Sequence, residues 1–249
     1  MRHCVWILGI ALLAACFPAE ASPVDCLKIP ASLNPEAHIQ VPEPEPKPEK
    51  TAYITIDDGP SEDVTPRILD ILKEQDIKAT FFVLPREATK HIMERIIREG
   101  HQLGNHSYSH DYNKLYRGDS QLFREEVLHM QTYLETQFGY QTSLFRFPGG
   151  SQSWDPAAIA ARRDILQELH YRDFDWDISL GDTDPSPAGR DPKVLAANVS
   201  GNLKGQEKLI LLMHDSPGKT ATAEALPEII ETLREKGYGF DVLGNYDQA

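Results

Sequence analysis

Cysteine is scarce in this chain of 249 residues, which contains only Cys4, Cys16 and Cys26. The first two lie in an N-terminal targeting region, so we expect Cys26 to be unpaired and predict no disulfide framework. Stability must then come from a hydrophobic core, for which 41% of hydrophobic residues is an ordinary and sufficient proportion.

Basic residues are also in short supply. Lys and Arg number 25 against 38 Asp and Glu, which gives a formal charge of −13. Nucleic acid is therefore not an expected partner, because no basic stripe is available to neutralise its phosphates. The charge decides nothing about a neutral sugar or peptide substrate.

The apolar run at the N-terminus, from Val5 to Ala15, is too short for a membrane span of about 20 residues. It follows Arg2, and a short apolar run behind a positive charge is typical of a secretory signal peptide. We predict this signal peptide over residues 1–21.

Two processing sites compete in this segment. The letters "AEA" before Ser22 form an A-x-A cleavage signal for a soluble secreted protein, whereas "LAAC" at 13–16 resembles a bacterial lipobox that would lipidate Cys16. We favour the lipobox, because the next segment suits a tether. Either route predicts export across the inner membrane to the periplasm or cell envelope, with membrane contact only through a lipid on Cys16.

Residues 22–50 contain the tract "VPEPEPKPEK", which cannot form a helix and has few apolar residues to bury. It is typical of an extended, semi-rigid spacer. The folded part is predicted over residues 51–249, and about 200 residues correspond to one domain. The sequence shows no internal repeat, and we expect a monomer.

Apolar, strand-like runs alternate with helical patterns throughout residues 51–249. Such alternation is typical of an α/β fold with mainly parallel pairing, and about seven units favour a closed or nearly closed barrel. The strands are predicted at 52–57, 78–84, 101–106, 143–148, 171–179, 208–214 and 238–243, and the helices at 65–75, 88–100, 120–138, 156–169, 192–203 and 225–237.

Polar residues gather where the predicted strands end. In a parallel barrel the chemistry collects at this end, because the loops that follow the strands meet there. We therefore predict one polar site built from dispersed segments, with these candidates: Asp57, Asp58, His106, His110, Arg146, Asp175, Trp176, Asp177, Asp182 and His214.

The spacing H-x-x-x-H of His106 and His110 places two imidazoles on one side of a helical turn or tight loop, as two metal ligands require. Alone, such a pair is more often two surface histidines. A carboxylate at a strand end favours a metal site, since two His and one Asp leave positions open for water and substrate. A cation would also remove the repulsion between the adjacent Asp57 and Asp58.

Four motifs, "TIDDGP", "HSYSH", "RFPGG" and "LLMHD", follow one another in an order that resembles the NodB-homology polysaccharide deacetylases, also called carbohydrate esterase family 4. The likeness covers essentially all of residues 51–249. It implies a distorted (β/α)7 barrel with one divalent metal ion, favoured as Zn2+ over Co2+, Mn2+ or Ni2+. Such enzymes remove N-acetyl groups from amino-sugar polymers or O-acetyl groups from xylan.

The resemblance implies three kinds of site residue. The implied catalytic residues are Asp57 as the base, Arg146 as the group that orients it, and His214 as the general acid. The implied metal ligands are Asp58, His106 and His110. The implied substrate-binding groups are the Gly149 N–H as an oxyanion donor, Leu212 in the acetyl-methyl pocket, and Trp176 as an aromatic wall of the groove.

Among the departures from the family pattern, two bear on the roles of these residues. Gly149 replaces a frequent tyrosine, which leaves the N–H but removes a ring from the groove. Ser179 stands where many members place an aspartate that tunes the acid histidine. Either that carboxylate is absent, or Asp177 or Asp182 substitutes for it beside His214.

The sequence therefore predicts a metal-dependent hydrolase that acts on an acetylated polysaccharide, with peptidoglycan or a chitin-like N-acetylglucosamine chain favoured as substrate. Peptidoglycan is favoured because a lipid tether would hold the domain close to the cell wall. The alternatives are a xylan O-acetyl esterase and a non-catalytic, metal-containing carbohydrate-binding module. The module is disfavoured, since a binding protein needs neither Asp57 as a base nor His214 as an acid.

Overall fold

A computed structural model of the chain describes residues 49–247. The predicted signal peptide at 1–21, with Cys16, lies outside these residues, and so does nearly all of the spacer predicted at 22–50. The described part contains the predicted alternation of strands and helices.

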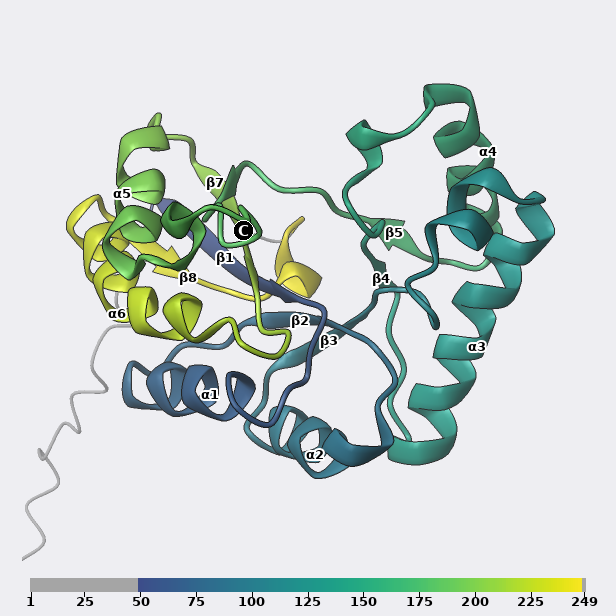
Figure 1. The fold of residues 1–249 in the computed structure, drawn as a ribbon, viewed down its shortest axis with the longest axis horizontal. Coiled ribbons are helices and arrows are strands. Elements are labelled where there is room, and N and C mark those ends of the chain that lie inside the picture. The colour runs from purple at the N-terminus through teal and green to yellow at the C-terminus, as the bar shows by residue number, and fades with distance from the viewer. Residues whose placement is uncertain (1–48, 248–249) are drawn as a thin grey trace, which may run out of the picture. The chain divides into compact units, whose positions relative to one another are not determined.

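Within residues 49–247, eight parallel strands form one curled sheet (Figure 1). Their order is β5-β4-β3-β2-β1-β7-β6, and β8 pairs with the beginning of β1. The bounds are Lys50–Asp57 (β1), Thr80–Val83 (β2), Gln102–Asn105 (β3), Leu144–Phe145 (β4), Arg172–Asp173 (β5), Ile178–Ser179 (β6), Lys208–His214 (β7) and Tyr238–Phe240 (β8). This pairing confirms the predicted parallel α/β fold.

The α-helices of the described part lie around the outside of the strands (Figure 1). Their bounds are Thr65–Glu74 (α1), Lys90–Arg98 (α2), Ser120–Phe138 (α3), Pro156–Glu168 (α4), Pro192–Asn202 (α5) and Thr220–Glu235 (α6). The last helix starts earlier than the predicted residue 225 and holds Pro227 in its interior. None of the helices in residues 49–247 combines the length and apolar character that crossing a membrane requires.

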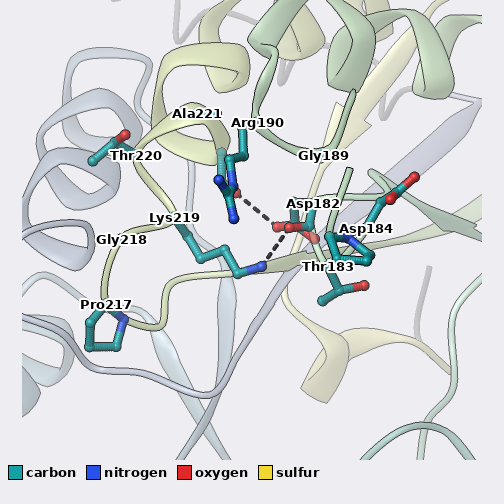
Figure 2. Close-up of a pocket in the computed structure, with 12 residues that line it drawn as sticks. Asp182, Thr183, Asp184, Gly189, Arg190, Pro217, Gly218, Lys219, Thr220 and Ala221 are labelled. Carbon is teal, nitrogen blue, oxygen red and sulfur yellow. Dashed lines mark hydrogen bonds between the residues drawn. The ribbon is translucent and has the colours of Figure 1, made fainter. Parts of the chain in front are cut away.

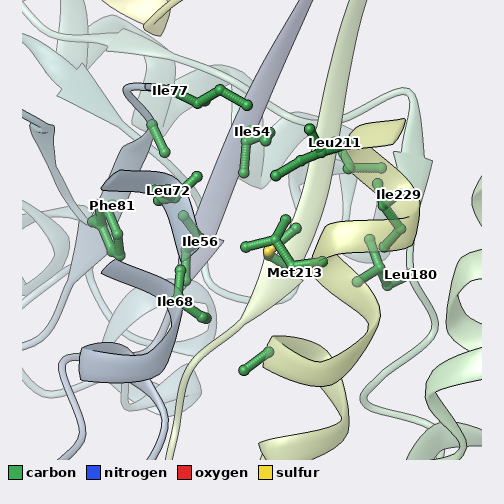
Figure 3. Packing of buried hydrophobic residues seen from close by; sticks show 14 of the residues in the cluster. Ile54, Ile56, Ile68, Leu72, Ile77, Phe81, Leu180, Leu211, Met213 and Ile229 are labelled. Atoms are coloured by element: carbon green, nitrogen blue, oxygen red, sulfur yellow. The ribbon is translucent and has the colours of Figure 1, made fainter. Parts of the chain in front are cut away.

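The main core lies between the middle of the sheet and the helices that cover its outer face (Figure 3). Ile54 and Ile56 of β1 and Leu211 of β7 join Ile68 of α1 and Ile229 of α6 in one buried cluster. Each fully buried side chain of this size contributes about 1.5–3 kcal/mol to folding. The strands β1 and β7 are therefore held firmly by their packing against α1 and α6.

The other face of the same two strands points into the curl, because side chains alternate along a strand. Thr55 and Asp57 of β1 lie on this inner face, as does His214 of β7. The two strands pair in register from Thr51 opposite Lys208 to Asp57 opposite His214. The predicted base and the predicted acid are thus direct neighbours at the ends of adjacent strands.

The prediction of a single strand at 171–179 is wrong. Its two ends form β5, which pairs with β4, and β6, which pairs with β7, so they belong to opposite edges of the curled sheet. Between them, the carbonyl oxygens of Phe174 and Asp175 accept hydrogen bonds from the guanidinium of Arg146, at 2.9 and 3.1 Å. These bonds fix the backbone of residues 174–175 between β5 and β6, at the opposite edges of the sheet. The sequence pattern did not indicate them.

Candidate active site

A cluster of possible metal ligands lies at the carboxyl ends of β1 and β3. Asp58, His106 and His110 each offer one ligand atom, and these atoms all lie within 4.8 Å of one another. Asp58 Oδ1 lies 3.4 Å from His106 Nε2 and 3.3 Å from His110 Nε2. The two imidazoles lower the pKa of Asp58 against the effect of burial, which would raise it. Two nitrogens around one carboxylate oxygen fit a divalent ion with positions left for other ligands.

The ring of His106 is held in the orientation that a ligand needs. Its Nδ1 lies 3.0 Å from the carbonyl oxygen of Arg146, so the proton belongs on Nδ1 and the Nε2 lone pair faces Asp58. The ring is 2% exposed. A backbone acceptor therefore selects the tautomer that can bind a metal.

The loop that carries the two histidines is fixed by a buried acid that sequence reasoning missed. Glu126 of α3 accepts hydrogen bonds from the backbone N–H and the hydroxyl of Ser109, at 2.6 and 2.8 Å. The hydroxyl of Ser107 accepts from the N–H of His110 at 3.1 Å. Positive φ angles at Asp58, Ser107 and His110 show that the backbone is strained here, as at many functional sites.

Asp57 and Arg146 form a buried ion pair beside this cluster. Arg146 Nη1 lies 3.0 Å from Asp57 Oδ1 and 2.6 Å from Thr55 Oγ1, and the arginine is fully buried. Burial lowers the pKa of Arg146, while the negative charge of Asp57 opposes that change. With two further bonds to the backbone, the guanidinium is fixed and holds the Asp57 carboxylate in one orientation.

The carboxylate beside His214 is Asp182, not Asp177. Asp182 Oδ1 lies 2.8 Å from His214 Nδ1, and its Oδ2 accepts from the His214 N–H at 2.8 Å. Asp177 instead accepts from the backbone N–H of Ile210 at 2.7 Å. The choice that the sequence left open is therefore decided by geometry.

The pair sets the charge of the imidazole. Burial alone would lower the pKa of His214, but the hydrogen bond and charge of Asp182, with smaller effects of Asp57 and Asp58, raise it to about 9. In turn, His214 lowers the pKa of Asp182 despite burial. His214 is therefore protonated near neutral pH and can donate a proton.

Two residues of α6 and the preceding loop support Asp182, and sequence reasoning missed both. The hydroxyl of Thr222 donates to Asp182 Oδ2 at 2.8 Å, and Lys219 Nζ donates to the Asp182 carbonyl oxygen at 2.5 Å. Figure 2 shows Lys219 reaching Asp182 at the wall of a cavity of about 480 Å³, which Arg190 also lines. No local sequence signal marks these contacts, because about 40 residues separate the partners in the chain.

Asp215, directly after His214, is a further buried acid that was not predicted. Its Oδ2 accepts from the Thr65 hydroxyl at 2.5 Å, and its N–H donates to the Asp57 carbonyl oxygen at 3.1 Å. Burial raises its pKa to about 7. A Cβ atom at Gly59 would lie 2.1 Å from Asp215 Oδ1, which explains the glycine after the paired aspartates.

The three predicted substrate-binding residues lie close to this centre. Gly149 and Trp176 line one small cavity of about 110 Å³, together with Gly150 and Asp175. Leu212 is buried on β7, two residues before His214 and on the same inner face of the strand. The fold thus brings the predicted residues to one end of the curled sheet, and the binding roles of these three stay predictions.

The strand ends of the curled α/β sheet carry a possible base held by Arg146, a cluster of possible metal ligands, and His214 held by Asp182. This arrangement is that of a hydrolase of the barrel type. The sequence profile of the family described as "Polysaccharide deacetylase" matches residues 45–168.

Three relatives illustrate the similarity. A putative polysaccharide deacetylase, YheN of Bacillus subtilis, is 38% identical over 78% of this chain and 67% of its own length. The peptidoglycan-N-acetylglucosamine deacetylase PgdA of Listeria monocytogenes is 33% identical over 88% of this chain, but this covers only 42% of PgdA. The structure of a CE4 esterase from Streptococcus mutans matches with a TM-score of 0.72 at 35% identity, covering 78% of this chain and 86% of that one.

The chain belongs to the polysaccharide deacetylase family. The prediction of a hydrolase of this family is therefore confirmed, and so is the predicted barrel of the NodB-homology type, which the Streptococcus structure shares.

Proposed function

We propose that this protein hydrolyses N-acetyl groups on polymers of N-acetylglucosamine, with peptidoglycan as the favoured substrate and Zn2+ as the favoured ion. The observation that carries the proposal is the arrangement of Asp57 and His214 on paired strand ends beside the cluster of Asp58, His106 and His110. The name of the Listeria relative supports peptidoglycan over other acetylated glycans.

The residues around the cluster can divide the reaction between them. When bound there, a divalent ion would polarise the acetyl carbonyl and make a water molecule more acidic. Asp57, fixed by Arg146, takes the proton of the attacking water. The Gly149 N–H donates to the oxygen on which negative charge develops.

The last step needs an acid, because an amine is a poor leaving group unless it is protonated. His214 supplies this proton, since its pairing with Asp182 keeps the ring charged near neutral pH. Loss of the proton leaves a neutral imidazole that is still oriented by the same carboxylate. A sugar-binding module would have no use for this pair of proton-transfer groups.

The test is acetate release by the purified protein after chelation and reloading with Zn2+. Penta-N-acetylchitopentaose, purified peptidoglycan and acetylated xylan serve as substrates, and Asp57→Asn serves as the control with metal content measured in parallel. We expect metal-dependent release from the two N-acetylated glycans. Release from xylan alone would replace the proposal with an O-acetyl esterase, and glycan binding without release from any substrate would replace it with a binding module.

We also propose that the protein works in the cell envelope, anchored through lipid on Cys16. The support is the sequence "LAAC" followed by the proline-rich spacer. Labelling of cells with a radioactive fatty acid should mark the wild-type protein and not Cys16→Ala. Absence of label from the wild type would favour cleavage before Ser22, and equal labelling of the two would overturn the assignment of the lipid to Cys16.

A further inference from the structure

Tyr112 is an aromatic side chain that is fixed in place and yet exposed to solvent, beside the possible metal ligands Asp58, His106 and His110. Its ring lies 5.3 Å from the ring of His110 and 5.1 Å, edge to face, from that of Trp154. The residue is nevertheless 40% exposed, among the highest values for large apolar side chains in residues 49–247. An exposed ring that two neighbours hold in place is suited to contact a ligand.

The glycine pair Gly149–Gly150 separates Tyr112 from Trp176. A Cβ atom on Gly149 would lie 3.3 Å from the Tyr112 hydroxyl oxygen, and one on Gly150 would lie 2.7 Å from a ring carbon of Trp176. Both glycines have positive φ angles, 77° and 80°, which other residues rarely adopt. The backbone between the two aromatic residues is therefore bare, and each ring approaches it from its own side.

This bare backbone is part of the proposed reaction centre. The small cavity lined by both glycines and Trp176 begins here, and Gly149 carries the N–H that we assign to the oxyanion. Tyr112 adds an apolar ring face and a hydroxyl that can both donate and accept a hydrogen bond. A sugar ring offers apolar C–H faces and hydroxyl groups at its edge, so it matches both features.

We propose that Tyr112 is a substrate-binding residue whose ring packs against a sugar of the polymer and whose hydroxyl bonds that sugar, on the side of the glycine pair away from Trp176. The inference rests on the proposed function and extends it to a residue outside the four motifs. A side chain on Gly149 would crowd the Tyr112 hydroxyl, so the glycine leaves room beside this group.

The experiment compares Tyr112→Ala and Tyr112→Phe with Tyr108→Ala. Tyr108 is a matched control, because it lies in the same segment and is 43% exposed, but its ring packs on His129 rather than on His110. Kinetics with N-acetylglucosamine oligomers gives kcat and KM. Calorimetry of penta-N-acetylchitopentaose with the zinc-loaded Asp57→Asn protein, with and without Tyr112→Ala, measures binding without turnover.

We expect Tyr112→Ala to raise KM and the dissociation constant about tenfold, equivalent to about 1.4 kcal/mol, with kcat within about twofold and metal content unchanged. Tyr112→Phe should show an intermediate loss, and Tyr108→Ala none. If the wild type is active and Tyr112→Ala has the same KM and dissociation constant, the inference is wrong while the proposed function stands. The same holds if Tyr112→Ala loses its metal. A wild-type protein that neither binds nor deacetylates the oligomer would contradict both the inference on Tyr112 and the proposed function.

Discussion

The exchange Asp182→Asn tests whether the carboxylate beside His214 keeps the acid charged. The variant preserves the size of the side chain and removes the negative charge that lies 2.8 Å from His214 Nδ1. Burial of the ring remains, and burial lowers the pKa of an imidazole. The carboxylates of Asp57 and Asp58 still face the ring and oppose part of this fall.

The expected change in the pKa of His214 follows from its value in the wild type, which the hydrogen bond and charge of Asp182 raise to about 9. Without Asp182 we expect the pKa to fall toward the ordinary value of about 6.5, a change worth about 3 kcal/mol. At pH 7.5 the protonated fraction would then drop from nearly all molecules to about a tenth. A bound cation lowers the pKa in both proteins, so the difference between them is the quantity to compare.

The assay is the pH dependence of kcat/KM for acetate release, measured from pH 5.5 to 10 in both proteins. Loss of the protonated acid sets the alkaline limb of the profile, and this limb should move to lower pH in Asp182→Asn. Asp177→Asn is the matched control, because its carboxylate bonds a backbone N–H and not the ring. An alkaline limb that stays in place in Asp182→Asn, or moves in Asp177→Asn, would refute the assignment.

Three further predictions concern the same end of the sheet. Asp57→Asn should lower kcat by about a hundredfold or more while the metal content stays constant, whereas Asp58→Asn should lose the metal; the reverse pattern would exchange the two roles. Gly59→Ala should lower the free energy of unfolding by about 1–3 kcal/mol in urea titrations, because its Cβ would collide with Asp215, and an unchanged midpoint would contradict this. The raised pKa of His214 contributes stability that is complete below its unfolded pKa of about 6.5 and is lost as pH rises through about 9, so wild-type Tm should fall across this window more than that of His214→Gln.

The sequence was sufficient for the parts of the fold that depend on local patterns. Apolar runs identify β1 and β7, and the motifs place Asp58 and the histidine pair after β1 and β3, whose ends the parallel pairing through β2 brings to one edge of the sheet. The ends of parallel strands lie at one edge of the sheet, so the positions of Asp58 and His106 could be predicted, whereas that of His110 also depends on the loop held by Glu126.

The supporting residues could not be predicted, because their roles arise from contacts between distant segments. Glu126 lies on α3 and Thr222 on α6, and each looks like an ordinary helix residue until the fold places it against a loop of the site. The partner of His214 was ambiguous for a related reason. Which of Asp177 and Asp182 reaches the ring depends on the turn between them, where Gly181 has a φ of 81°.

The pairing of Asp57 with His214 has a consequence for how this enzyme could change its substrate. Asp57 and His214 stand opposite each other on the paired strands β1 and β7, which are buried over most of their length, so the spacing of these two groups is a property of the scaffold. Loops that contact the sugar can be lengthened, shortened or replaced without changing the distance between Asp57 and His214, as long as β1 and β7 stay paired. Engineering for a different glycan should therefore vary the surroundings of Tyr112 and Trp176 and leave these two strands untouched.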